Sequence, residues 1–225
     1  AYVFTTYCIG VFMIIVIGGN KASGKSTTLQ NLVVALSKHQ KIAVLDTDVQ
    51  QSFTKWHIRR QKSGIESNFT VHAEHGKIAK KLLSLENEND VVFVDVKGSN
   101  SEEFIVASSL SKLVVVPLES TIKSLETLAE LQTQYDEIKK INPDVIFSVF
   151  QVKATTNTFI AGNQRNFFLN ECKKYPSFKT LNSIIYFRNS FISSDEEGKT
   201  VLETSDKKAI NEVVGLASEL VNVIG

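Results

Sequence analysis

The sequence predicts an α/β fold in which a mostly parallel sheet is covered by helices on both faces. Short apolar, β-branched runs recur along the chain, and amphipathic helical stripes fill the gaps between them. No internal repeat or low-complexity linker interrupts this alternation. Strands joined by helix-length crossovers run parallel, and strands that are apolar throughout are buried on both faces.

Six apolar runs predict the strands of this sheet. They are Ile14–Ile17, Ile42–Leu45, Val91–Val94, Leu113–Val116, Val145–Val149 and Ser183–Phe187. Helical stripes with spacing of three and four residues lie between or after them. Their apolar members are Leu29, Leu32, Val33 and Leu36; Leu128, Leu131, Tyr135 and Ile138; and Ile210, Val213, Val214, Ala217, Leu220 and Val221.

Composition limits the class of protein. The 225 residues include 25 Lys and Arg against 24 Asp and Glu, so the net charge is +1. This near-neutral balance argues against binding nucleic acid by overall charge alone. The apolar content, with 14 Phe, excludes disorder as the main state. The two cysteines make no disulfide framework, which favours a reducing, cytoplasmic compartment.

The first twenty residues carry no charged side chain. Thr and Gly interruptions, and the lack of a basic leading segment, fit neither a membrane span nor a signal peptide. Met13 is the single methionine, and residues 1–12 are interpreted as an added or upstream-derived extension; an extra edge strand is the alternative. Residues 13–225 are expected to form one domain.

A phosphate-binding loop follows the first predicted strand. Gly19-Asn-Lys-Ala-Ser-Gly-Lys-Ser26 matches the G-x4-G-K-[ST] pattern between a strand and an amphipathic helix. Backbone N–H groups and the helix N-terminus then point at a polyphosphate, as in a P-loop NTPase-type fold. The lysine can reach the phosphates and the serine hydroxyl can ligate Mg²⁺. The residues expected to bind nucleotide here are Gly19, Asn20, Ala22, Ser23, Gly24, Lys25, Ser26 and Thr27.

Aspartates end two of the predicted strands. Asp46 and Asp48 follow the second apolar run, and Asp95 follows the Val91–Val94 run. The carboxyl ends of parallel strands share one sheet edge, which is where such folds bind ligands. We therefore expect these carboxylates to serve Mg²⁺ and the attacking water of a nucleotide hydrolase.

The segment from Asp46 to Trp56, Asp-Thr-Asp-Val-Gln-Gln-Ser-Phe-Thr-Lys-Trp, resembles the D-x-D-P-Q-x-S-x-T-x-W stretch of ParA/MinD-type ATPases with a deviant Walker A loop. The resemblance is nearest to the short ParF-like partition ATPases. It continues through residues 94–101, 113–118 and 191–206, and so covers nearly everything from Met13 onward.

This resemblance implies roles for individual residues. Lys25 and Ser26 would bind the phosphates and Mg²⁺, Asp48 would position the attacking water, and Asp46 and Asp95 would support the metal site. The Pro117 region and the loop around Phe191 would approach the adenine of ATP or ADP. The family's signature lysine position is occupied by Asn20, and Lys21 is expected to take that catalytic role.

The resemblance also implies a biological role. It predicts a Mg²⁺-dependent ATPase whose ATP-driven homodimerisation serves plasmid or chromosome partition in a bacterial or archaeal cytoplasm, associated with the nucleoid or a plasmid. The implied partners are a small centromere-binding adaptor protein and nonspecific DNA. Two alternatives stay open: a conjugative-transfer accessory ATPase of the VirC type, which would include a non-hydrolysing scaffold, and a small-molecule kinase or ligase of the dethiobiotin-synthetase kind.

Two weaker patterns were considered. His72 and His75 flank Glu74, but no third ligand lies at metal-binding spacing, so a surface or capping role is favoured. A basic patch for DNA is conceivable at Lys173, Lys174, Lys179 and Arg188, although a solvated face is the simpler interpretation.

Overall fold

The computed structural model describes residues 13–20 and 22–225. The proposed extension over residues 1–12 and the catalytic role expected of Lys21 therefore lie outside the described residues. In the described part, no helix is long and apolar enough to cross a membrane.

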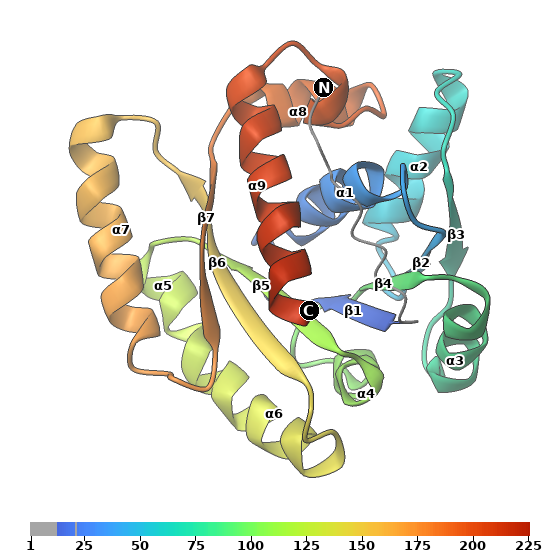
Figure 1. Cartoon of the computed structure of the whole chain (residues 1–225), viewed down its shortest axis with the longest axis horizontal. Helices are drawn as coiled ribbons and strands as arrows, with labels where there is room; N and C mark the ends of the chain where they lie inside the picture. The colour runs from blue at the N-terminus through green and yellow to red at the C-terminus, as the bar shows by residue number, and fades with distance from the viewer. Residues whose placement is uncertain (1–12, 21) are drawn as a thin grey trace.

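A seven-stranded sheet, all parallel in the described residues, forms the centre of the fold (Figure 1). The predicted α/β class is thus confirmed. The strand order is β3-β2-β4-β1-β5-β6-β7. The strands are β1 Met13–Ile17, β2 Ile42–Asp46, β3 Phe69–Ala73, β4 Val91–Asp95, β5 Leu113–Leu118, β6 Ile146–Ala154 and β7 Lys179–Tyr186.

Strand β3 is missing from the sequence-based prediction. It lies at the sheet edge, and of its five residues Phe69 alone is buried. A strand that is largely exposed does not need the continuous apolar run by which the other six were recognised.

Helices cover both faces of the sheet. They are α1 Lys25–Leu36, α2 Ser52–Lys62, α3 Ala79–Glu88, α4 Glu102–Leu110, α5 Ile122–Leu125, α6 Thr127–Ile141, α7 Thr158–Cys172, α8 Asn189–Glu196 and α9 Lys207–Ile224, with the 3₁₀ turn η1 Val201–Glu203. Alternation along β1 shows the two layers: Ile15 and Ile17 pack with α1, α2 and α9, whereas Ile14 and Val16 pack with α3 to α7. The inner strands β1, β2, β4 and β5 therefore need apolar residues at successive positions.

The chain changes direction across the sheet at β1, which lies between β4 and β5. Such a reversal point opens a crevice at the carboxyl ends of the strands. The register places Asp95 beside Ile17 on one side and beside Asp46 on the other. The phosphate loop and the two aspartates are consequently brought together by the sheet itself.

Helix α2 is fixed against the segment that follows α8. Its buried Arg60 donates to both carboxylate oxygens of Glu203 at 2.8 Å and to the Gly198 carbonyl at 3.3 Å. Trp56 Nε1 donates to the Lys199 carbonyl at 3.2 Å. We call this contact, formed by Trp56, Arg60, Gly198, Lys199 and Glu203, the α2–α8 junction.

Gly198 allows the two backbones of the junction to approach. Its φ is +71°, and a Cβ added there would lie 2.5 Å from Arg60 Cα. Both the left-handed conformation and the close contact exclude a side chain.

We expect Gly198→Ala to destabilise the protein by about 3 kcal/mol or more, because it combines backbone strain with overpacking. The matched control is Gly215→Ala in α9, where an added Cβ meets nothing within 4 Å. That change should stabilise the helix by about 0.5–1 kcal/mol. Urea unfolding of both variants measures the difference, and equal midpoints would contradict the packing role of Gly198.

Candidate nucleotide-binding site

The loop between β1 and α1 has the backbone geometry of a phosphate cradle. Gly19 has a φ of 115° and Gly24, directly before α1, has a φ of 84°. These conformations favour glycine, and they let the loop curl back onto the helix N-terminus. The Ser23 hydroxyl is buried without a hydrogen-bond partner among the described residues. An unsatisfied donor at this place fits a phosphate oxygen.

Lys25 begins α1 and is directed back into the loop. Its ammonium group donates to the Asn20 carbonyl at 2.8 Å. Burial lowers the pKa of Lys25, and the nearby Asp95 and Asp48 carboxylates act in the opposite direction. Lys25 is buried, and among the described residues its ammonium group donates to a carbonyl alone, so it is well placed to exchange that acceptor for a phosphate oxygen.

The residues that fit a Mg²⁺ ion are Ser26, which follows Lys25 in α1, and Asp95 at the end of β4. Ser26 Oγ donates to Asp95 Oδ2 at 3.1 Å. Burial raises the pKa of Asp95 to about 7, and the neighbouring Asp46 carboxylate adds to this rise. A buried carboxylate without a cation thus stays largely protonated up to neutral pH, which is the setting that a bound divalent cation would relieve.

The set of oxygen donors fits Mg²⁺ rather than a softer metal. Mg²⁺ is usually held by one or two protein oxygens together with phosphates and water. Across residues 13–20 and 22–225, no group of three or more His, Cys, Asp or Glu side chains could hold a metal ion by itself. Accordingly, His75 Nδ1 is hydrogen-bonded to the Thr47 carbonyl at 2.9 Å, and His72 lies near the Thr70 hydroxyl.

Asp46 is adjacent to Asp95, but its oxygens have other partners. Oδ2 accepts from the backbone N–H and the hydroxyl of Thr54, at 2.9 and 2.7 Å, and Oδ1 accepts from the Asp48 N–H at 3.2 Å. Burial raises the pKa of Asp46, and these hydrogen bonds oppose the rise. In this structure Asp46 therefore orients the first turn of α2 and the residue expected to hold water. Its expected support of the metal stays a prediction.

Asp48 lies at the mouth of the site. Its Oδ1 accepts from the Gln50 N–H at 2.9 Å, and its side chain lines the same polar cavity as Lys25 and Ser26. The Asp48 N–H donates to Asp46 Oδ1, so Asp46 anchors the loop that carries the Asp48 side chain. A carboxylate in this position can orient a water toward a terminal phosphate.

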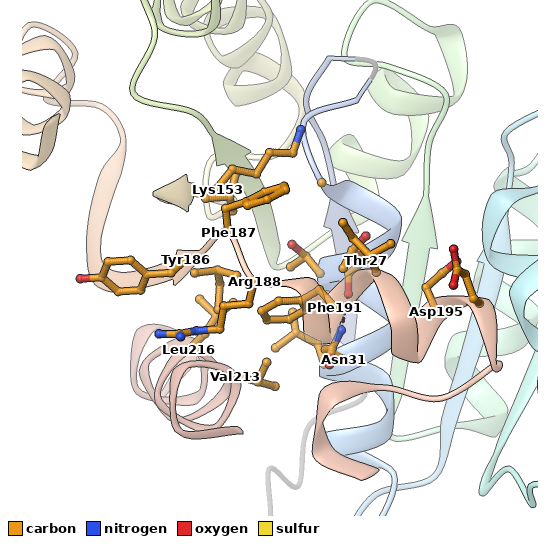
Figure 2. Close-up of a pocket in the computed structure, with 17 residues that line it drawn as sticks. Thr27, Asn31, Lys153, Tyr186, Phe187, Arg188, Phe191, Asp195, Val213 and Leu216 are labelled. Atoms are coloured by element: carbon orange, nitrogen blue, oxygen red, sulfur yellow. Dashed lines mark hydrogen bonds between the residues drawn. The ribbon is translucent and has the colours of Figure 1, made fainter. Parts of the chain in front are cut away.

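Two neighbouring cavities extend from the loop. An apolar cavity of about 340 Å³ lies between α1, the ends of β6 and β7, α8 and α9. Figure 2 shows Phe191 in this cavity, between Arg188 on one side and Asn31 of α1 on the other. A polar cavity of about 830 Å³ contains Lys25, Ser26 and Asp48. Gly24 and Thr27 line both cavities, so they join an apolar compartment to a phosphate compartment.

Phe191 thus lies where a base could bind, as the resemblance implies. Pro117 is a buried residue of β5, and its carbonyl lies beside Gly19. Among the described residues that line the two cavities, Pro117 does not occur. Its carbonyl lies near the phosphate loop, beside Gly19.

Part of the possible DNA patch is neutralised. Arg188 pairs with Glu212 at 2.5 Å and Lys174 pairs with Glu171 at 2.7 Å. Arg188 also lines the apolar cavity. These pairs favour the interpretation of a solvated face.

Several functional candidates were missed from the sequence. Thr54 holds Asp46, Asp195 accepts from both Gln30 and Arg59, and Lys153 reaches the phosphate loop from β6. Lys153 follows the predicted strand Val145–Val149 closely, and this placement is a signal that could have indicated it. No local pattern identifies Asp195, whereas Thr54 is the threonine of the D-x-D-P-Q-x-S-x-T-x-W stretch quoted above.

The fold and the site together define a P-loop nucleotide-binding protein, because a glycine loop, a buried lysine, a Ser–Asp pair and a base-sized cavity meet at one sheet edge. The chain belongs to the CobQ/CobB/MinD/ParA nucleotide binding domain family, which it matches over residues 14–201. The expected enzyme class, a ParA/MinD-family ATPase, is confirmed at the level of this family. No match is found among curated proteins.

Solved structures share the fold at low sequence identity. A McdA–ATP complex from Cyanothece is 14% identical, with a TM-score of 0.77, covering 94% of this chain and 97% of that chain. A plasmid partition protein from Borrelia burgdorferi is 17% identical, with a TM-score of 0.66 and coverage of 94% and 99%. The MinC:MinD cell division complex from Aquifex aeolicus is 14% identical, with a TM-score of 0.76 and coverage of 93% and 96%.

We expect the nucleotide-free protein to lose stability as the pH rises from about 4 to about 7. The pKa of Asp95 is about 7 in the folded chain against an ordinary value of 3.8. The folded state therefore keeps a proton that the unfolded state has already released, and this advantage disappears as the pH passes 7. The shift corresponds to ~4 kcal/mol at most.

Urea unfolding at several pH values tests this expectation. Asp95→Asn imitates the protonated side chain, so its stability should fall less steeply over the same range. Identical pH dependence in the variant and the original chain would show that Asp95 is not the group responsible.

Proposed function

We propose that the chain is a Mg²⁺-dependent ATPase that acts as a nucleotide-driven dimerisation switch in DNA segregation. The observation that carries the proposal is the junction of the two cavities at Gly24 and Thr27. A nucleoside triphosphate bound there would place its base against Phe191 and its phosphates at Lys25 and Ser26. Family membership supports the nucleotide part of the proposal.

Hydrolysis would be phosphoryl transfer to water. Lys25 would exchange the Asn20 carbonyl for a phosphate oxygen and neutralise charge that develops during transfer. Asp48, held by its loop, would orient the attacking water in line with the terminal phosphate. Ser26 and Asp95 are the residues that would hold Mg²⁺, directly or through water, and the bound ion would reduce the negative charge of the phosphates.

A homodimer would form across the polar cavity. This cavity is open at the carboxyl edge of the sheet and carries five cationic side chains and two carboxylates. Its cations are Lys25, Lys55, Arg59, Lys97 and Lys153. A bound triphosphate would reduce the positive charge of this surface and so lower the repulsion between two copies. Hydrolysis and phosphate release would reverse the change.

The segregation role rests on resemblance in the sequence and on the plasmid partition protein among the fold neighbours. A small centromere-binding adaptor and nonspecific DNA are the proposed partners, in a bacterial or archaeal cytoplasm with nucleoid or plasmid association. The McdA and MinC:MinD neighbours are not named as plasmid partition proteins. DNA as the cargo is therefore the most specific part of the proposal.

A non-hydrolysing scaffold of the VirC type is the second candidate. It is favoured by one observation, the Asn20 side chain at the position of the family's signature lysine. A small-molecule kinase or ligase would differ from both by turning over ATP only with a small acceptor. Phosphate release from ATP alone, with DNA, and with candidate acceptors distinguishes the three.

We expect Lys25→Ala to abolish ATP binding, since it removes the buried ammonium group of the phosphate loop. Isothermal titration calorimetry with Mg²⁺ measures the loss. Lys38→Ala, on the segment after α1, is the control and should bind like the original chain. Undiminished binding by Lys25→Ala would refute the site.

Asp48→Ala should keep ATP-dependent dimerisation and lose phosphate release by a factor of about 100 or more. The reason is that Asp48 orients water without holding the nucleotide. Light scattering with ADP, ATP and a nonhydrolysable analogue measures dimerisation, and a phosphate assay measures turnover. Unchanged phosphate release would remove Asp48 from the mechanism.

A further inference from the structure

Lys153 reaches the phosphate loop from a distant part of the chain. It lies near the end of β6, and its ammonium group donates to the Ala22 carbonyl at 2.6 Å. The same group pairs with Glu119 Oε1 at 2.7 Å. Figure 2 shows the Lys153 side chain extended toward the loop that precedes α1. The side chains of Lys153 and Glu119 are 39% and 33% exposed, so a ligand can reach them.

The backbone conformation at Lys153 directs the side chain toward the phosphate loop. Its φ is +52°, in the left-handed region that non-glycine residues rarely adopt. The pairing of β6 with β7 is irregular between Gln151 and Ala154, on either side of the lysine. Gln151 and Ala154 are buried, whereas Lys153 is exposed. The irregularity thus directs a cation to the loop at the expense of regular pairing, as strained residues at ligand sites do.

Two lysines hold the phosphate loop in the same way. Lys25 binds the carbonyl of Asn20, and Lys153 binds the carbonyl of Ala22. Neutral carbonyls are weaker acceptors for an ammonium group than phosphate oxygens. Both bonds can therefore be exchanged when a polyphosphate enters. Lys153 thus brings a second positive charge to the phosphate loop, at the Ala22 carbonyl.

The position of Lys153 selects one end of a nucleotide. Lys153 lines both cavities, but Ala22, whose carbonyl accepts its hydrogen bond, lines only the polar cavity. The ammonium group therefore lies on the side of Lys25 and Asp48, away from the apolar compartment of Phe191. A nucleotide whose base occupies the apolar compartment would present its last phosphate there.

We propose that Lys153 is a second phosphate-binding lysine that contacts the terminal phosphate of ATP, and that Glu119 competes for it in the nucleotide-free state. This inference rests on the proposed function, because it assumes a nucleoside triphosphate in the site. Glu119 neutralises Lys153 until a more strongly charged acceptor arrives. The pair thereby favours a triphosphate over a diphosphate.

Calorimetric titration with Mg²⁺ and either AMPPNP or ADP tests the inference. Lys153→Ala should weaken AMPPNP binding about tenfold, the value of one lost charge-assisted hydrogen bond, and ADP binding less than about twofold. Its unfolding midpoint should stay unchanged, because the pair is partly exposed. Equal losses for both nucleotides, or no loss, would overturn the assignment.

Glu119→Gln provides the opposite test. Without its counter-ion, Lys153 is free for phosphate, so AMPPNP binding should tighten about two- to fivefold and ADP binding should change little. In the double variant with Lys153→Ala this gain should vanish. A gain that persists in the double variant would show that Glu119 does not act through Lys153.

The exposed pair Lys140–Glu137 on α6 supplies matched controls. Lys140→Ala and Glu137→Gln should leave both affinities as they are, and parallel changes in these controls would reduce the effect to overall charge and overturn the proposal. If the original chain bound neither nucleotide, the proposed function and this inference would both fall. If it bound both and Lys153→Ala matched it, the inference alone would fall.

Discussion

The fold is organised around two carboxylates that are buried side by side. Asp46 and Asp95 end neighbouring strands at the same level, and each is buried. Two acids in such an environment cannot both be ionised without strong compensation. The structure separates their partners: Asp46 is hydrogen-bonded to the start of α2, and Asp95 to the start of α1. Both helices are thereby attached to the sheet at the point where phosphate would bind.

This arrangement explains which parts of the site could be predicted. The phosphate loop and the aspartates are local patterns, since each follows directly from a strand that is visible in the sequence. Lys153 meets Ala22 across 131 positions, and Gln30 meets Asp195 across 165. Such contacts depend on how the strands are ordered in the sheet, and local patterns in the sequence do not show that order.

The prediction from apolar runs missed one strand, β3. Apolar runs predicted six strands, most of which are buried on both faces, and the class of fold followed from them. Edge strand β3 has a mixed pattern, because its neighbours cover it incompletely. The role expected of Pro117 came from resemblance and stays a prediction; its carbonyl lies near Gly19.

The α2–α8 junction has an optical consequence. Trp56 is the single tryptophan of the chain, and it is buried, with its indole N–H on the Lys199 carbonyl and the Arg60 guanidinium 5.6 Å from its ring centre. Helix α2 leads from Asp48, and α8 carries Phe191. Tryptophan fluorescence therefore arises between the loop that carries Asp48 and the apolar cavity that Phe191 lines. Its emission would report, without any label, whether these two parts of the site move together.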